Sequence, residues 1–323
     1  MARYAGVSTA VVSYVLNNSP KPVATATRAR VLEAISVLNY RPNAAARALS
    51  RGVNDMIGMI VPDSRNPYFA ELVHAVDRAA QRQGRTLLVI NSDSRRSETS
   101  DHITALSSHQ LDGVVVADTL STPERALISS LGIPIVLINQ FSGDSSIPAF
   151  GVDYQAGARS GVEHLINHGH KHIAFIGGDP QIDQRERGWI EALSEVGLAL
   201  GPRYRVGFSL EAGYRAGRLL ANESTPPTAV FVASDQLAFS AISAFHERGL
   251  RVPEDVAVVS FDATAESAYI WPPLTTVAQP VALVATAAIE QLFSNSTATD
   301  FQSFPTHLIV RASCGCSLKR LQD

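Results

Sequence analysis

The feature that most constrains the fold is an alternation of two kinds of segment from Met56 onward. Short apolar runs that end in turn residues, such as MIGMIVPD, TLLVINSD and DVAVVSFD, predict buried strands. Segments with helical spacing that end at glycine, such as PYFAELVHAVDRAAQRQG and QLAFSAISAFHERG, predict amphipathic helices. Strands that alternate with helices through short connections form parallel sheets with helices on both faces. Because the alternation restarts after Gly151, we expect two doubly wound lobes in tandem.

Polar residues gather where the predicted strands end. The ends read VPDSRNPYF, INSDS, VADT, INQF, GGDPQ, ASDQ and SFDAT, and Asp, Asn, Ser and Gln are frequent in them. Ligands of doubly wound sheets bind outside the carboxyl ends of the strands. The sequence therefore predicts a cleft for a polar ligand between the lobes.

The first 52 residues differ from the rest in charge. They hold seven Lys and Arg residues against one acid, a net charge of +6, whereas the remainder carries −9 and the whole chain −3. A basic head on an acidic body suggests an anionic partner for the head alone, although a solvated basic surface would look the same.

The first 40 residues also show helical patterns. Ser8 is the expected N-cap of a first apolar stripe (Val11, Val12, Val15, Leu16), and Thr25 or Thr27 caps a second (Val31, Leu32, Ile35, Leu38).

Several longer segments carry a resemblance to a known family. They include AGVSTAVVSYVLN, TRARVLEAISVLNYRPNAAARALSRG, IGMIVPDSRNPYFAEL, GVEHLINHGHKHIAFIGG, ASDQLAFSAISAFHERGLRVPEDVAVVSFD and LIVRASC. On these motifs the chain resembles the LacI/GalR family of bacterial transcription regulators almost end to end. The resemblance implies a small all-α helix-turn-helix head, a hinge helix, and an α/β body of two parallel-sheet lobes like periplasmic binding proteins. It also implies a homodimer or tetramer on a pseudo-palindromic operator.

The resemblance divides the chain into four parts. Residues 1–41 match the DNA-binding head, and residues 42–54 the hinge helix and its linker. Residues 55–150 with 281–308 match one lobe, and residues 151–280 with 309–323 match the other. Only Met1 to Ala5 precede the turn at Gly6, so we expect a truncated first helix and a native start upstream of Met1.

DNA-binding positions carry over onto the head and the hinge. The matching residues are Ser8, Thr9, Ala10, Ser13, Tyr14, Arg28, Asn43, Ala46 and Leu49. Family members usually have Arg where this chain has Tyr14, and Arg binds guanine through two parallel donors, which Tyr cannot supply. Tyr14 therefore predicts an altered operator code, unless it only packs beside a phosphate. Leu49 matches the leucine that wedges into the minor groove at the centre of the operator.

Effector-binding positions carry over onto the strand ends. The matching residues are Asp63, Asn66, Tyr68, Phe69, Gln140, Arg185, Phe208, Ser234, Asp235, Asp262 and Gln279. Arg, Asp, amides and aromatic rings suit a sugar or sugar derivative, and Arg185 with Asp262 also suits a purine. Structural alternatives stay open: Asp235 and Asp262 as helix caps, Tyr68 and Phe69 as core residues, and Arg185 in a surface ion pair with Glu186 or Glu191.

Neither a metal nor a cofactor is expected. Cys314 and Cys316 are the only cysteines, and no second Cys or His pair lies at matching spacing, so we read them as two reduced thiols in a tail. His168, His170 and His172 resemble a metal tract but match the family's turn into a strand. The P-loop, G-x-S-x-G, H-E-x-x-H and G-x-G-x-x-G motifs are all missing, which argues against an enzyme.

The sequence thus predicts a cytoplasmic, sequence-specific transcriptional regulator, a repressor, whose operator affinity is controlled by a small molecule bound between the lobes. No apolar run is long enough to span a membrane, and the N-terminus lacks a signal peptide. The alternative is a sensor like a sugar-binding protein, with a head that no longer binds DNA specifically.

Overall fold

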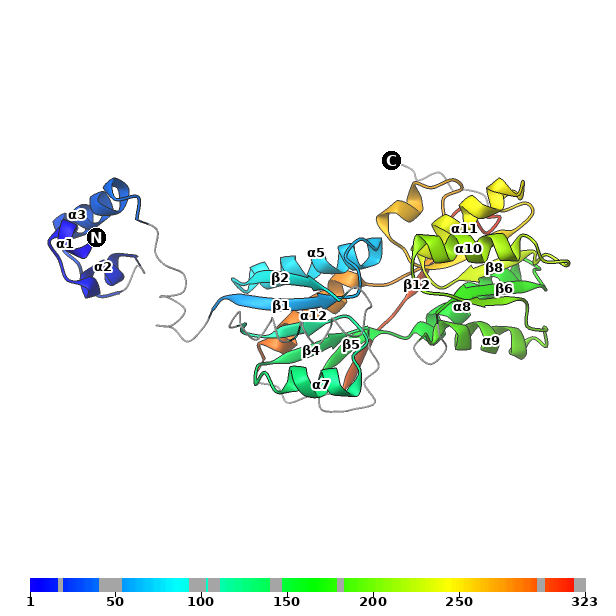
Figure 1. The fold of residues 1–323 in the computed structure, drawn as a ribbon, viewed down its shortest axis with the longest axis horizontal. Helices are drawn as coiled ribbons and strands as arrows, with labels where there is room; N and C mark the ends of the chain where they lie inside the picture. The colour runs from blue at the N-terminus through cyan, green and yellow to red at the C-terminus, as the bar shows by residue number, and fades with distance from the viewer. Residues whose placement is uncertain are drawn as a thin grey trace. The chain divides into compact units, whose positions relative to one another are not determined.

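The computed structural model consists of two compact units, a head (Met1–Asn54) and a body (Asp55–Asp323) (Figure 1). It describes residues 1–16, 20–40, 54–92, 103, 111–139, 147–178, 183–294 and 300–316. The predicted hinge and linker at 42–54, apart from Asn54, and the predicted effector residue Gln140 lie outside these residues. None of the described helices is long and apolar enough to cross a bilayer.

Three helices form the described part of the head: α1 (Ala2–Ala5), α2 (Thr9–Leu16) and α3 (Thr25–Val37). Gly6 ends α1 in the left-handed region at φ 63°, where a residue without Cβ fits best, and this turn leads into α2. The three helices share one small core of Ala5, Val12, Val15, Val31 and Ala34. As predicted, α1 is a single turn.

Details of the head differ from the sequence-based expectation. Ser8 does accept a bond from the backbone N–H of Val11, at 3.4 Å. At the start of α3, however, Ala24 is the N-cap and no threonine side chain caps the helix. Leu32 and Leu38, predicted to be buried, are 53% and 45% exposed. The buried face of α3 is narrow because the contacts with the two short helices need only the positions of Val31 and Ala34.

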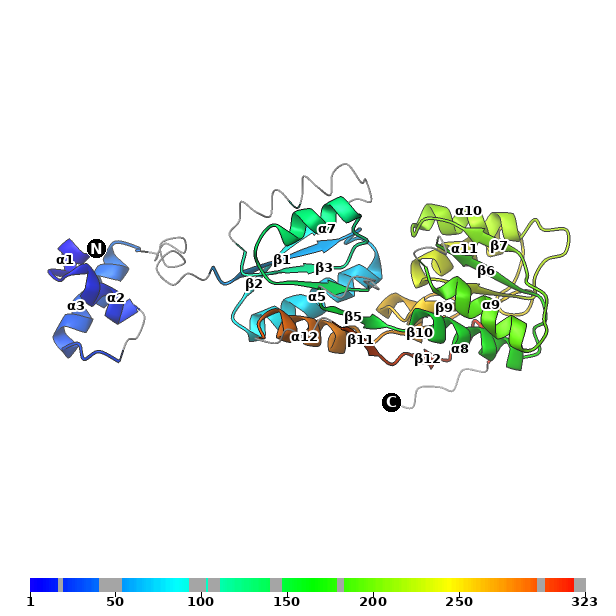
Figure 2. The same ribbon diagram turned by 90° about the horizontal axis from the view of Figure 1, so that it is seen from below.

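The first lobe of the body contains a six-stranded parallel sheet in the order β11-β5-β4-β3-β1-β2. Its strands are β1 (Met56–Val61), β2 (Thr86–Asn91), β3 (Val114–Val116), β4 (Ile135–Ile138), β5 (Ala149–Val152) and β11 (Phe301–Phe304). Figure 2 shows α5 (Pro67–Arg82) and α12 (Val281–Leu292) on one face and α7 (Thr122–Ser129) on the other. Strands buried on both faces read as continuous apolar runs, which is why MIGMIV and IVLI form β1 and β4.

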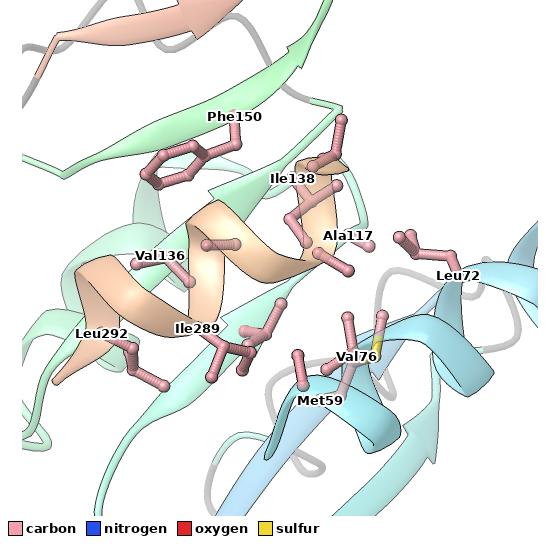
Figure 3. Packing of buried hydrophobic residues seen from close by; sticks show 14 of the residues in the cluster. Met59, Leu72, Val76, Ala117, Val136, Ile138, Phe150, Ile289 and Leu292 are labelled. Carbon is pink, nitrogen blue, oxygen red and sulfur yellow. The ribbon is translucent and has the colours of Figure 1, made fainter. Parts of the chain in front are cut away.

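The core beneath α5 and α12 holds this lobe together (Figure 3). Side chains from the sheet meet side chains from the two helices there. They are Met59, Val136, Ile138 and Phe150 from the strands, Leu72 and Val76 from α5, and Ile289 and Leu292 from α12.

The second lobe contains a sheet in the order β12-β10-β9-β8-β6-β7. Its strands are β6 (Ile173–Gly177), β7 (Arg203–Arg205), β8 (Ala229–Val232), β9 (Ala257–Asp262), β10 (Thr275–Ala278) and β12 (His307–Ile309), and only β12 is antiparallel to its neighbour. Helices α8 (Tyr154–Asn167) and α9 (Arg185–Glu195) cover one face, and α10 (Leu210–Leu220) and α11 (Asp235–Glu247) cover the other. The 3-10 helix η1 (Ala265–Ala268) follows β9.

Gly188 fixes how closely α9 approaches α8. A Cβ at this position would lie 2.2 Å from the carbonyl oxygen of Gln155 and 2.8 Å from the backbone nitrogen of Arg159. Since both atoms belong to the backbone of α8, only glycine permits this contact. The close crossing sets the position of α9 and hence of Arg185, its first residue.

The chain crosses between the lobes three times, through short links after β5, β10 and β11. The predicted crossing at 150/151 falls inside β5, and the predicted return at 308/309 falls inside β12. Both strands are only three or four residues long, and β12 is a partly exposed edge strand, so neither has a distinct apolar pattern.

Candidate functional site

A cavity of about 1100 Å³ lies between the two lobes of the body. Residues at the carboxyl ends of several strands form its wall, as expected for doubly wound sheets. Nine predicted effector residues line it: Asp63, Asn66, Tyr68, Phe69, Arg185, Phe208, Ser234, Asp262 and Gln279. The wall also contains Tyr154 and Asp183, which were not predicted. Asp118 and Asn139 lie there too, in the predicted strand ends VADT and INQF, but they were not among the predicted effector residues.

Arg185 is the best-positioned cation of the cavity. Its Nε donates to Asp183 at 2.7 Å, and its Nη1 donates to the carbonyl oxygen of Ala233 at 2.7 Å. The guanidinium carbon lies 4.8 Å from the ring centre of Tyr154 and 5.1 Å from that of Phe208. Aromatic faces attract a guanidinium, so rings and carboxylate together hold this side chain in one orientation.

The alternative of a surface ion pair for Arg185 is wrong. Its side chain is 13% exposed. Glu186 instead binds Arg203 and Arg205, and Glu191 binds Gln155 and Arg159.

Asp262 lies beside Arg185 in the wall, with its Oδ1 3.9 Å from Nη1. The residue ends β9 at φ 113°, an unusual backbone conformation for a residue with a Cβ. Gln279 donates to Asp262 Oδ1 at 2.8 Å from the link after β10. Burial and the nearby charge of Asp235 raise the pKa of Asp262, and Arg185 only partly offsets this.

Tyr68 connects the start of α5 with the link after β10. Asn66 caps α5 by accepting from the backbone N–H of Tyr68 at 3.0 Å, which fixes the start of the helix. The Tyr68 hydroxyl lies 3.4 Å from Gln279 Oε1 and accepts from Asn139 Nδ2. Tyr68 is also part of the core of the first lobe, and Phe69 packs against that core, so both are wall and core residues at once.

The remaining predicted residues line the cavity in different ways. Ser234 caps α11 by accepting from the backbone N–H of Leu237. Asp63 binds the exposed side chain of Arg65, which lowers the pKa of Asp63. Phe208 is 38% exposed, with its ring against Arg185.

Asp235 is not part of the cavity wall, contrary to the effector-binding prediction. Its carboxylate is fully buried and accepts from Ser260 Oγ at 2.5 Å, Thr276 Oγ1 at 2.7 Å and the backbone N–H of Thr264 at 2.7 Å. Burial raises the pKa of Asp235 to about 6, although these bonds favour the charged form. The residue therefore ties β9, β10 and η1 together behind the site.

Acids outnumber bases in the described wall. Asp63, Asp118, Glu124, Asp183 and Asp262 lie there with only Arg185 and Arg205 as cations. Arg205 is bound to the buried Glu186, and Arg185 lies between two carboxylates. The cavity therefore favours a neutral polar ligand over an anion.

The predicted DNA-binding face is on α2. Ser8, Thr9, Ala10 and Ser13 are all exposed, whereas Tyr14 is half-buried. Lys21 donates to the Tyr14 hydroxyl at 3.1 Å, and its ammonium lies 4.8 Å from the ring centre. Arg28, on α3, is half-buried, and Asn43, Ala46 and Leu49 lie outside the described residues. Helix α2 contains no basic residue, but Lys21 from the following segment places a positive charge beside it.

Comparison with known families matches both units. Residues 1–43 match the model for bacterial regulatory proteins of the lacI family, and residues 162–314 match a periplasmic binding protein-like domain. The HTH-type transcriptional repressor PurR of Pasteurella multocida (strain Pm70) is 35% identical over 300 residues, which cover 91% of this chain and 90% of the relative. Catabolite control protein A of Priestia megaterium is 34% identical, with 90% of each chain covered.

Solved structures agree with these relatives. A crystal structure of the lac repressor dimer bound to operator and the anti-inducer ONPF gives a TM-score of 0.85 at 27% identity, covering 97% of each chain. The complex of the transcriptional regulator CelR with cellobiose gives 0.74 at 28% identity, covering 97% of this chain and 98% of the other. From its two matched domains and its relatives of 34–35% identity along nine-tenths of their length, this chain belongs to the lacI family of bacterial regulatory proteins.

Proposed function

We propose that this transcriptional regulator is a repressor whose operator affinity is set by a neutral sugar in the cavity between its lobes. The observation that carries the proposal is the arrangement of Arg185 and Asp262. Donors of a guanidinium and acceptors of a carboxylate lie side by side in the wall, 3.9 Å apart. Neighbouring hydroxyls of a sugar both donate and accept, so they match such a pair.

The rest of the wall supports a neutral hydroxylated ligand. Phe208, Tyr68 and Tyr154 offer ring surfaces on which the C–H face of a sugar can lie. Asn139 Oδ1 is buried at the wall and has no donor among the described residues, so a ligand hydroxyl or a water would satisfy it. A phosphorylated sugar would bring negative charge to a wall where acids already outnumber bases.

A nucleobase is the second candidate. Arg185 and Asp262 could bind the polar edge of a purine while Phe208 stacks on its ring. The relatives named PurR favour this reading, and the structures solved with cellobiose and with ribose favour a sugar.

At the operator, we assign base contact to the exposed face of α2 with Tyr14. Because Lys21 donates to the Tyr14 hydroxyl, the hydroxyl keeps its own proton for an acceptor on a base edge. One donor replaces the two of an arginine, so the preferred base at this position differs from that of relatives with Arg. We propose a cytoplasmic homodimer, since a pseudo-palindromic operator needs two heads, with Leu49 as the wedge in the minor groove.

We propose binding and no catalysis for the cavity. This proposal is supported by the relatives of 34–35% identity, which are a transcriptional repressor and a catabolite control protein.

A thermal-shift screen of neutral sugars, sugar phosphates and nucleobases tests the ligand class. At about 100 times its Kd, a ligand adds about 2.7 kcal/mol, which corresponds to a rise in melting temperature of about 5–10 °C. We expect a neutral sugar to give this shift and Asp262→Asn to abolish it. Arg159→Ala is the control, because Arg159 binds three glutamates outside the cavity. A sugar-induced shift that survives in Asp262→Asn would contradict the assignment, and a shift with nucleobases alone would favour the second candidate.

Salt-dependent DNA binding tests the regulator against a sensor with an inactive head. We expect an operator fragment to bind at least 1000-fold more tightly than random DNA, the usual lower limit for specific binding. Equally weak binding to both kinds of DNA, with the same dependence of affinity on salt concentration, would favour the sensor.

A further inference from the structure

A cluster of four metal-ligating side chains lies in the second lobe, among the residues that the structure describes. His164 and His168 come from the end of α8, and Cys314 and Cys316 from the turn after β12. The two imidazole nitrogens and two sulfurs all lie within 4.8 Å of one another. None of the four lines the effector cavity.

The local fold brings each pair together. His164 lies in the last turn of α8 and His168 is its C-cap, so the spacing of four places both rings on one side of the helix. On the other side, Gly315 separates the cysteines at φ 91°, a left-handed conformation that favours glycine and turns the chain. Ser313 fixes this turn to the sheet, because its hydroxyl donates to Val258 O and accepts from Thr275 N.

The ligand atoms lie within about 1 Å of the spacing in tetrahedral zinc. Bonds of about 2.0 Å to nitrogen and 2.3 Å to sulfur separate tetrahedral ligand atoms by about 3.3–3.8 Å. His164 Nε2 lies 3.2 Å from Cys314 Sγ and 3.8 Å from Cys316 Sγ, and His168 Nε2 lies 3.1 Å from Cys316 Sγ. The ring centres of the two histidines are 4.6 Å apart.

We propose that His164, His168, Cys314 and Cys316 form a Cys2His2 site for zinc. Two sulfurs and two nitrogens in a tetrahedral set select Zn²⁺ over the hard cations that prefer oxygen. Four protein ligands close the coordination sphere, which is the composition of a structural rather than a catalytic site. Each thiol binds as a thiolate and releases its proton to solvent, and the metal stays divalent.

The surroundings of the cluster favour a stable site. Thr275 donates from Oγ1 to Cys314 Sγ at 3.1 Å, a bond that would orient the sulfur and stabilise its charge as a thiolate. Cys314 is 1% exposed, so its sulfur is protected from solvent. With metal bound, the site would fasten the chain after β12 to the end of α8.

Metal titration of the reduced, chelator-treated full-length protein tests the site. We expect one tightly bound zinc per chain and the release of about two protons per zinc, one from each thiol. With Co²⁺ as the probe, we expect a thiolate-to-cobalt charge-transfer band together with the intense visible bands of tetrahedral cobalt. Both readouts use the wild-type protein, so they do not depend on the stability of a variant.

Two variants and a control locate the ligands. Cys316→Ser and His168→Asn change partly or fully exposed residues and should fold, which circular dichroism checks. Removal of a residue that hydrogen-bonds to a metal ligand weakens metal binding about 10- to 100-fold. Removal of a ligand itself should therefore weaken binding at least as much. His170→Asn is the matched control from the same HGHKH tract, because the His170 ring contacts Thr228 and is not one of the four clustered residues. The proposal is overturned if folded wild type shows no charge-transfer band, if binding survives Cys316→Ser, or if His170→Asn weakens it as much as His168→Asn.

Discussion

Replacing Arg185 by Ala should destabilise the body strongly, even with no effector present. The side chain is 13% exposed, and its partners are buried further, at 2% for Asp183 and 5% for Asp262. Without the guanidinium, two carboxylates remain in a poorly solvated wall with no cation between them. Removal of one partner from a buried ion pair costs about 3–5 kcal/mol, and we expect a loss in this range at pH 7.

The pH dependence of this loss has a defined sign. Burial and Asp235 already raise the pKa of Asp262, and the loss of Arg185 raises it further. A carboxyl group whose pKa is raised on folding binds a proton more readily in the folded state, so acid favours folding. The deficit of Arg185→Ala should therefore shrink as the pH falls from 7 towards 5.

Urea unfolding of four proteins measures the effect: wild type, Arg185→Ala, Asp183→Asn and the double variant. Because Asp183→Asn removes one of the uncompensated charges, the double variant should be more stable than the sum of the single effects predicts, by about 1–3 kcal/mol. Arg159→Ala, which disrupts an exposed cluster of ion pairs, should unfold close to wild type. A deficit below about 1 kcal/mol for Arg185→Ala, with the pH slope of wild type, would refute the reasoning, because it would mean that water solvates the two carboxylates.

Three further outcomes follow from the structure. Tyr14→Phe should weaken operator binding about 2- to 10-fold and leave random DNA unaffected, as one hydrogen bond is lost; anisotropy titrations measure both, and equal losses would place Tyr14 at a phosphate. Since the pKa of Asp235 is raised to about 6, its ionisation should remove up to about 3 kcal/mol of stability between pH 4 and 7. Asp235→Asn should flatten that slope in urea unfolding, and an unchanged slope would assign it to other groups. Gly188→Ala forces a Cβ against the backbone of α8 and should cost about 1–3 kcal/mol or more by calorimetry, whereas an unchanged melting temperature would mean that α9 shifts freely.

The apolar pattern predicted seven of the described strands and overlooked five short ones, β5, β7, β10, β11 and β12. MIGMIV and AVVSFD are continuous runs because helices cover both sides of β1 and β9. The edge strands β7 and β11 read RYR and FQSF, with exposed positions that interrupt any run. The buried strand β10 reads TTVA, so two polar residues interrupt its apolar pattern. The hydroxyl groups of these threonines form buried hydrogen bonds with Asp235, Cys314 and Arg311.

Most of the effector residues that the resemblance predicted line the cavity. The resemblance pointed to Arg185 and Asp262, and the structure places both at the cavity. It also pointed to Asp235, but an acid at the end of a strand can turn inwards as well as outwards, and the order of residues does not say which.

The roles of Asp183 and of the proposed zinc ligands depend on tertiary contacts that cannot be predicted from the sequence alone. The signal for Asp183 was its position two residues before Arg185, at the start of a helix. The partners of Cys314 and Cys316 lie about 150 residues away on α8. A search for nearby ligands along the chain could not have found them.

The three short links between the lobes have a mechanical consequence. Residue 153, residues 279–280 and residues 305–306 separate the last element of one lobe from the first element of the other. Because each of the three links has only one or two residues, we expect them to prevent the lobes from sliding or separating. A hinge-like bending of one lobe relative to the other is then the motion that remains. Gln279 belongs to one link and also holds Asp262 in the wall. We therefore expect a ligand in the cavity to change the angle between the lobes at this link.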